Sequence, residues 1–258
     1  MRPWPFARIA AHRGCGTTAP ENTLAGFRRG LELGYRAIET DAMLSADKIP
    51  VIMHDEKFGR TILDDARSVP ELTAAEIRML DAGRYYSPQY AGEPPALFEQ
   101  IVGWCRANDV WMNIEIKPAK GFERETGRVV GRITAERYAD VVVEGGATQD
   151  GISVKAPLFS SFKAEALRGA KEAAPNIPRG FLIDEIPSDW KDIVRELECV
   201  SLHCNFRRIT PEFIKEVKDM GLWLFCYTPN DPEVIRALLR SGVDAVCTDR
   251  LDIVSPAL

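Results

Sequence analysis

The chain has 258 residues, of which 45% are hydrophobic and 28% are charged, a composition typical of globular proteins rather than of disordered, fibrous or membrane proteins. Its formal net charge is −5 and its pI is about 5.4, so it lacks the basic surface expected of a nucleic-acid-binding protein. Its apolar runs are too short to span a bilayer, and we expect no stable membrane association.

The cysteines and the amino-terminal residues indicate a reducing compartment. Met1–Pro5 lack the apolar core of a signal peptide. The six cysteines include no C-x-x-C pair, and most lie in or beside apolar runs, which is typical of small buried thiols. We therefore expect a cytoplasmic protein without disulfides. The sequence gives no indication of its oligomeric state.

Short apolar runs alternate with amphipathic segments along the chain. The expected strands are Arg8–Ala11, Ala37–Met43, Trp111–Ile116, Leu158–Phe162, Gly180–Ile183, Cys199–Leu202, Trp223–Tyr227 and Ala245–Thr248. The expected helices are Asn22–Leu33, Ala96–Arg106, Arg124–Arg137, Lys163–Ala173, Asp189–Leu197, Pro211–Met220 and Pro232–Arg240. This alternation, with Asn22 as an expected helix cap, predicts an α/β protein with a single (β/α)8 TIM barrel domain over residues 1–258.

Residues 56–95 interrupt the alternation. They contain no strong strand pattern and are rich in charge, Gly, Pro and Tyr. A second small domain is one interpretation of this segment. We favour a small cap inserted after the second barrel strand, because loops at the ends of barrel strands commonly carry function.

Two of the three histidines stand at the ends of strand-like runs. His12 lies in Ala10-Ala-His-Arg-Gly14 and His54 in Pro50-Val-Ile-Met-His-Asp55. Catalytic groups of barrels usually lie at the carboxyl ends of strands. Either histidine alone is more typical of a hydrogen-bonded structural residue, but nearby acidic residues favour an acid–base role for the pair.

Acidic residues alternate with apolar ones on the second expected strand. Glu39 and Asp41 are two apart and therefore share a face. Two carboxylates on one face repel each other unless a cation joins them, and oxygen ligands suit Mg²⁺ or Ca²⁺. Salt bridges to Arg13 or Arg36 would be the purely structural explanation.

A third polar cluster occurs in Asn113-Ile-Glu-Ile-Lys117. Asn113, Glu115 and Lys117 share one face of the expected strand. Glu115 could complete a metal site, and Lys117, with Arg13, could contact a phosphoryl group. An antiparallel edge strand with a solvated polar face is the alternative. Charge neutralisation and two acid–base groups are what phosphodiester cleavage requires.

Late aromatic residues provide further candidates for the pocket. Trp223, Phe225 and Tyr227 share one face of the seventh expected strand. We consider Trp223 and Tyr227 as substrate-binding residues, with barrel core as the alternative for Trp223. His203 and Asp249 also lie near strand ends, and Asp249 is equally compatible with a helix cap.

The ordered motifs resemble the glycerophosphodiester phosphodiesterase family, and the short cytosolic bacterial members in particular. The matching segments are His12-Arg-Gly14 with Pro20-Glu-Asn-Thr23, Glu39-Thr-Asp41, Pro50-Val through His54-Asp55, Asn113-Ile-Glu-Ile-Lys117, Trp223 to Asn230 and Gly242 to Asp249. They extend from about residue 7 to residue 250. The series of motifs is far more specific than any one of them.

The resemblance implies a TIM barrel with an inserted cap and a divalent cation, Mg²⁺ or Ca²⁺, held by Glu39, Asp41 and Glu115. It implies His12 and His54 as the acid–base pair, which we assign as base and acid respectively. A small glycerophosphodiester would be hydrolysed to sn-glycerol 3-phosphate and an alcohol. Attack by the glycerol 2-hydroxyl through a cyclic phosphate and direct attack by water both fit the sequence.

Two alternative functions are compatible with these residues. A lipid-directed barrel phospholipase would carry an exposed apolar rim or a basic patch, and residues 56–95 show neither clearly. A non-catalytic barrel that binds phosphodiesters would be expected to lack a histidine or a metal ligand. All five expected positions carry competent residues, which favours the enzyme.

Overall fold

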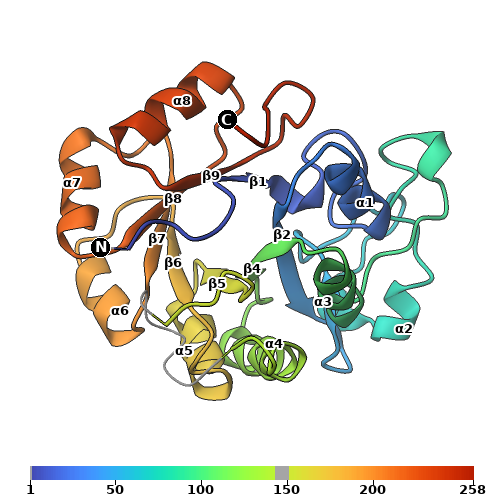
Figure 1. The fold of residues 1–258 in the computed structure, drawn as a ribbon. Coiled ribbons are helices and arrows are strands. Elements are labelled where there is room, and N and C mark those ends of the chain that lie inside the picture. The colour runs from blue at the N-terminus through green and yellow to red at the C-terminus, as the bar shows by residue number, and fades with distance from the viewer. Residues whose placement is uncertain (1, 143–150) are drawn as a thin grey trace.

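The computed structural model describes residues 2–142 and 151–258 of the chain. Within them, eight parallel strands close into a barrel, because β1 pairs with both β2 and β9. Around the barrel (Figure 1) the strands are β1 (Ile9–Ala11), β2 (Ala37–Leu44), β4 (Trp111–Ile116), β5 (Leu158–Ser161), β6 (Arg179–Ile183), β7 (Ser201–Asn205), β8 (Trp223–Tyr227) and β9 (Ala245–Thr248).

Helices surround the barrel (Figure 1). They are α1 (Leu24–Glu32), α3 (Phe98–Ala107), α4 (Glu123–Arg137), α5 (Ala164–Ala173), α6 (Trp190–Glu196), α7 (Pro211–Asp219) and α8 (Pro232–Ser241). Side chains of Thr23, Thr210 and Asp231 accept hydrogen bonds from the free N–H groups that begin α1, α7 and α8. The expected TIM barrel is confirmed. No helix in the described residues is long and apolar enough to cross a membrane.

Aromatic side chains close the amino-terminal end of the barrel. Trp111 and Trp223, the first residues of β4 and β8, belong to one apolar cluster with Trp4 and Phe6 of the amino-terminal segment. Phe6 stacks on Trp111 with 4.3 Å between ring centroids. A larger apolar core lies between the strands and the helices. The polar part of the barrel interior therefore lies toward the carboxyl ends of the strands.

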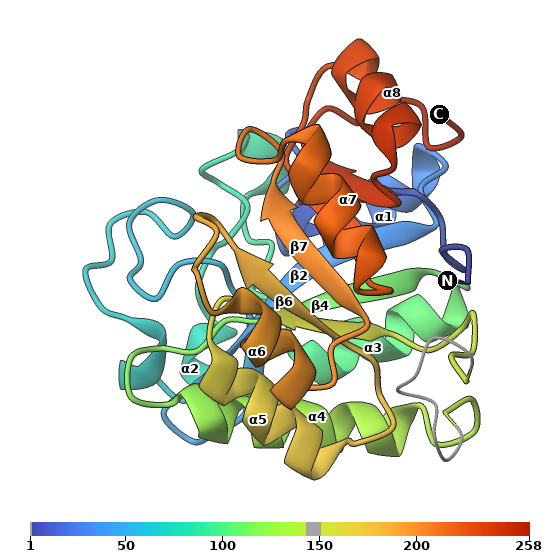
Figure 2. The same ribbon diagram turned by 90° about the vertical axis from the view of Figure 1, so that its left-hand side faces the viewer.

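A short extra strand and the inserted segment follow β2. The extra strand, β3 (Pro50–Ile52), pairs antiparallel with the end of β2 outside the barrel. Residues 56–95 contain one short α-helix, α2 (Ala74–Ile77), and two 3-10 helices, Val69–Glu71 and Pro88–Tyr90. The hydroxyl of Tyr85 accepts a hydrogen bond of 2.9 Å from the backbone N–H of Glu21, in the loop after β1. Figure 2 shows this segment, in light blue to cyan, on the side to which the strand arrows point.

Candidate active site

A cavity of about 170 Å³ opens at the carboxyl ends of the barrel strands. Asp41 contacts the polar groups of this cavity from a fully buried position. Most of the residues that the sequence singled out line the cavity, namely His12, Arg13, Glu39, His54, Glu115, Lys117 and Tyr227.

Three carboxylates meet beside this cavity. Glu39 and Asp41 project from β2 and Glu115 from β4, and Asp41 and Glu115 are register partners. One oxygen atom of each residue lies within 4.8 Å of the others, and all three residues are buried. Carboxylate oxygens this close together could hold a hard divalent cation. The folded chain therefore brings the expected metal ligands together.

The electrostatics of these carboxylates also fit a bound cation. Burial raises the pKa of Glu39 to about 7 and that of Glu115 to about 8, and the charge of Asp41 adds to both effects. Burial alone would raise the pKa of Asp41, but Lys117 and other nearby positive charges lower it. Near neutral pH, protons and a metal ion therefore compete for Glu39 and Glu115.

His12 lies in the turn that follows β1 and is held by the end of β9. Its Nδ1 is 2.6 Å from Asp249 Oδ1, and its Nε2 is 3.8 Å from Glu39 Oε2. Burial by itself lowers the pKa of His12, but the hydrogen bond with Asp249 and the charge of Glu39 outweigh burial and raise it above 6.5. Asn230 Nδ2 donates to the second oxygen of Asp249 at 3.1 Å. Asp249 thus fixes the orientation of the ring.

His54 has a matching carboxylate partner. Its Nδ1 is 2.6 Å from Asp55 Oδ1, and Asp55 Oδ2 accepts a hydrogen bond from Arg60. Its Nε2 is 2.8 Å from Lys117 Nζ. Burial lowers the pKa of His54, and Lys117 lowers it further against the opposing charge of Asp41. His54 therefore favours the neutral form, with an Nε2 lone pair that accepts a hydrogen bond from the ammonium group.

Arg13 and Lys117 supply positive charge at the cavity. Arg13 has a left-handed backbone with φ of 51°, and its N–H donates to Glu39 Oε2 at 3.1 Å. Its guanidinium group donates to Glu21 at 2.8 Å. Lys117 Nζ lies 3.3 Å from Glu115 Oε1. Both cations are partly exposed to the cavity and can contact an anionic ligand there.

Asn22 belongs to the site, although the sequence pattern suggested a helix cap. Thr23 caps α1 instead. The Asn22 side-chain amide donates to Asp41 Oδ2 at 2.8 Å and accepts a hydrogen bond from Thr40 at 3.0 Å. Asn22 therefore orients the most deeply buried carboxylate of the three.

The two expected substrate-binding aromatic residues lie at opposite ends of β8. Tyr227 lines the cavity, donates a hydrogen bond to the Ile183 carbonyl at 2.9 Å and contacts the ring of Phe162 edge-on. Trp223 is fully buried near the amino-terminal end, where its Nε1 donates to the Arg2 carbonyl. The expected substrate contact of Trp223 has no support in this geometry, and we leave Trp223 out of the site.

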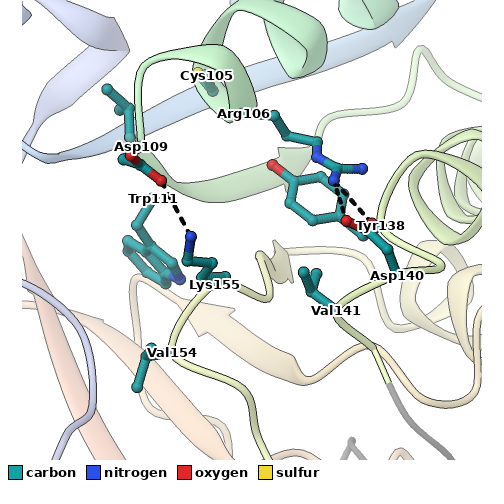
Figure 3. Close-up of a pocket in the computed structure, with 10 residues that line it drawn as sticks. Cys105, Arg106, Asp109, Trp111, Tyr138, Asp140, Val141, Val154 and Lys155 are labelled. Atoms are coloured by element: carbon teal, nitrogen blue, oxygen red, sulfur yellow. Dashed lines mark hydrogen bonds and ion pairs between the residues drawn. The ribbon is translucent and has the colours of Figure 1, made fainter.

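A larger hollow, of about 500 Å³, lies at the amino-terminal end of β4 (Figure 3). Its charged side chains pair with one another: Arg106 lies 2.6 Å from Asp140, and Lys155 lies 3.3 Å from Asp109. Among the described residues that line it, there is no histidine and no cluster of carboxylates. The smaller cavity, which combines these groups, is therefore the candidate active site.

Together, the barrel and this constellation define a TIM-barrel hydrolase equipped to cleave phosphodiesters. The profile of the glycerophosphoryl diester phosphodiesterase family matches residues 12–253. The chain belongs to this family, and it is an enzyme that hydrolyses glycerophosphodiesters.

Individual relatives agree with this assignment over nearly the whole chain. A glycerophosphodiester phosphodiesterase of Caldanaerobacter subterraneus is 33% identical over 249 residues, which cover 93% of each chain. The solved structure of an Oleispira antarctica phosphodiesterase in complex with the product sn-glycerol-3-phosphate has a TM-score of 0.85 and 31% identity, covering 97% of this chain and 96% of its own. The solved structure of a putative glycerophosphoryl diester phosphodiesterase from Silicibacter pomeroyi has a TM-score of 0.77 and 25% identity, covering 96% of this chain and 92% of its own.

Proposed function

We propose that this chain hydrolyses glycerophosphodiesters to sn-glycerol 3-phosphate and an alcohol, with His12 and His54 as its acid–base pair. The observation that carries this proposal is the joint placement of both histidines beside three carboxylates in one cavity. The product bound to the Oleispira antarctica relative supports the choice of product. Tyr227 would contact the substrate at the cavity wall.

Glu39, Asp41 and Glu115 would hold Mg²⁺ or Ca²⁺, since both ions prefer oxygen ligands. When bound, the cation would neutralise charge on the phosphate and lower the pKa of an attacking hydroxyl or water. Arg13 and Lys117 would bind phosphate oxygens through charge-assisted hydrogen bonds.

The hydrogen bonds suggest which histidine performs which proton transfer. Asp55 accepts a hydrogen bond from Nδ1 of His54, so the lone pair is on Nε2. Once Lys117, which now donates to Nε2, turns to the phosphate, Nε2 can take a proton from the attacking oxygen. Asp249 stabilises the protonated ring of His12, which then donates its Nε2 proton to the leaving oxygen as the bond to phosphorus breaks. This proposal reverses the assignment made from the sequence, because the pKa is lowered for His54 and raised for His12.

The rate of hydrolysis is expected to depend on pH as a bell-shaped curve. The active form has His54 neutral and His12 protonated. Because the pKa is lowered for His54 and raised for His12, this form is most abundant between the two pKa values. Activity should decrease at pH values lower than the pKa of His54 and at pH values higher than the pKa of His12. Measuring kcat/KM from pH 5 to pH 10 at saturating metal checks this, and a rate that is constant across this range would exclude the pair.

Asp249→Asn should weaken the acid without unfolding the barrel. Loss of the carboxylate lowers the pKa of His12, so the alkaline limb of the profile moves to lower pH. We expect kcat to fall by roughly 10²–10⁴-fold, because the imidazolium loses its partner. Circular dichroism and the pH profile of the variant test this. A lower rate with an unmoved alkaline limb would show that Asp249 is only structural.

The substrate preference can be tested by comparing a soluble glycerophosphodiester with phospholipids in vesicles that carry the same head group. Soluble glycerophosphocholine should be hydrolysed with release of sn-glycerol 3-phosphate, detected by a coupled dehydrogenase. Lysophosphatidylcholine and phosphatidylcholine in vesicles should be turned over at least about 10²-fold more slowly, because a small cavity lined largely by polar and charged side chains does not favour acyl chains. Faster turnover of the vesicle lipid would favour the phospholipase alternative.

Two further proposals concern the chain as a whole. We propose that it acts as one TIM-barrel domain with residues 56–95 as a cap over the active site, which is supported by the hydrogen bond between Tyr85 and Glu21. We also propose a cytoplasmic location. The six cysteines, all free and buried, support a reducing compartment.

A further inference from the structure

Three uncharged side chains that line the active-site cavity each have a buried polar atom with no hydrogen-bond partner among the described residues. These atoms are Asn113 Oδ1, Ser160 Oγ and His203 Nδ1. The exposed fractions of these residues are 2%, 0% and 0%. Buried polar groups are nearly always paired, because leaving them unpaired is costly. Three such atoms in one cavity therefore point to a ligand that pairs with them.

These atoms lie beside the carboxylates, on residues at matching positions in the sheet register. Asn113 is the register partner of Glu39. Asn113 precedes Glu115 by two residues on the same face of β4, which places it about 7 Å closer to the amino end of the strand. Ser160 is the register partner of Glu115 on β5. His203 lies in the middle of β7, with its ring stacked on Phe225 at 4.8 Å between centroids. Three strands thus contribute to one polar wall.

A glycine makes room for the imidazole of His203. Gly180 lies on β6, between the strands that carry Ser160 and His203. A Cβ atom at Gly180 would stand 2.5 Å from both His203 Nε2 and Ser201 Oγ, so a larger residue would displace the imidazole. The cavity volume of about 170 Å³ is several times the roughly 30 Å³ that one water molecule occupies in the liquid. Part of a substrate can therefore enter.

The wall is polar but uncharged. His203 Nε2 is paired with Ser201 Oγ at 3.0 Å, and burial lowers the pKa of His203 to about 3, so its ring is neutral. Asn113 Oδ1 accepts a hydrogen bond, and Ser160 Oγ can both donate and accept. A hydroxyl group also donates and accepts, and it fits such a wall. An ammonium or phosphate group would find no opposite charge on these three side chains.

We propose that Asn113, Ser160 and His203 form a hydroxyl-binding subsite beside the carboxylates, which receives a free hydroxyl group of the glycerol portion of the substrate. The subsite rests on the proposed function, and it names the residues that select diesters with unesterified glycerol.

Binding of two phosphate monoesters of the same length tests the subsite. sn-Glycerol 3-phosphate has two hydroxyl groups, and propyl phosphate has none. Calorimetry with Mg²⁺ present should show tighter binding of sn-glycerol 3-phosphate to the wild type. The affinity ratio is the affinity for sn-glycerol 3-phosphate divided by that for propyl phosphate. In Ser160→Ala and in Asn113→Leu this ratio should fall by about tenfold, the value of a hydrogen bond at a buried site. The affinity for propyl phosphate itself should not change. Thr134→Val, which removes a buried hydroxyl on α4, should leave the ratio unchanged.

The stability of the variants separates binding from structure. Since Asn113 Oδ1 has no hydrogen-bond partner within residues 2–142 and 151–258, Asn113→Leu should keep or raise the melting temperature while it lowers the affinity ratio. An unchanged ratio in both folded variants would overturn the subsite and leave only water in the cavity. Wild-type hydrolysis of glycerophosphocholine is measured in parallel. Its absence would count against the proposed function, whereas hydrolysis with an unchanged ratio would count against the subsite alone.

Discussion

Replacing either His12 or His54 with glutamine is expected to lower kcat by about 10²–10⁴-fold, the range that a positioned acid or base contributes. Glutamine keeps most of the volume of the ring and can still form hydrogen bonds, but it cannot exchange a proton near neutral pH. Each nitrogen that faces the cavity is held there by a carboxylate on the opposite ring nitrogen. The double variant should be little worse than either single variant, because the two residues act as a unit.

The leaving group distinguishes the acid from the base. The p-nitrophenyl ester of sn-glycerol 3-phosphate releases a phenolate that needs no proton. On this substrate His12→Gln should recover most of the wild-type rate, because its acid is no longer required. His54→Gln should stay slow, because the attacking oxygen still needs a base. Recovery of His54→Gln instead would restore the assignment made from the sequence, and recovery of neither would remove both roles. Thermal unfolding of each variant serves as the control for folding.

Local patterns were sufficient to predict the barrel and most of the candidate site. Period-two alternation on β2 and β4 placed Glu39, Asp41 and Glu115 on inward faces, and closure of the barrel brought them together. β7 begins two residues later than expected, at Ser201, because the backbone N–H of Cys199 still bonds to α6. That shift moves His203 from the expected strand end into the barrel interior.

Contacts between residues far apart in the sequence could not be predicted from local sequence patterns. Asp249 is 237 residues from His12, and only their shared position at the ends of β9 and β1 reveals the pair. The short strand β3 has three residues and begins with Pro50, too little for a periodic pattern. Trp223 shares a face with Tyr227 but lies four residues earlier, about 13 Å along the strand. Position along a strand, as well as the face, decides which aromatic residue reaches the site.

Removal of the divalent cation is expected to abolish hydrolysis, and Glu115→Gln should reproduce this loss. Burial raises the pKa of Glu115 to about 8, so in the metal-free protein at pH 7 this side chain is largely protonated and uncharged. Glutamine resembles that neutral form, and the metal-free variant should melt close to the metal-free wild type. A cation at about 100 times its Kd contributes about 2.7 kcal/mol to folding, which raises the wild-type melting temperature by about 5–10 °C.

The Glu115→Gln variant should lose the metal-dependent rise in melting temperature, because one of its three metal ligands no longer carries charge. Glu136→Gln is the matched control. Glu136 lies on the exposed face of α4 in an ion pair with Arg132, and its replacement should change neither the metal-dependent rise in melting temperature nor kcat.

Raising the pH from 6 to 9 should strengthen cation binding to the wild type, since Glu39 and Glu115 release their protons in this range. Calorimetric titration with Mg²⁺ and with Ca²⁺ measures both effects. Full activity in EDTA, or a melting temperature that does not respond to either ion, would show that these carboxylates serve the fold without a metal.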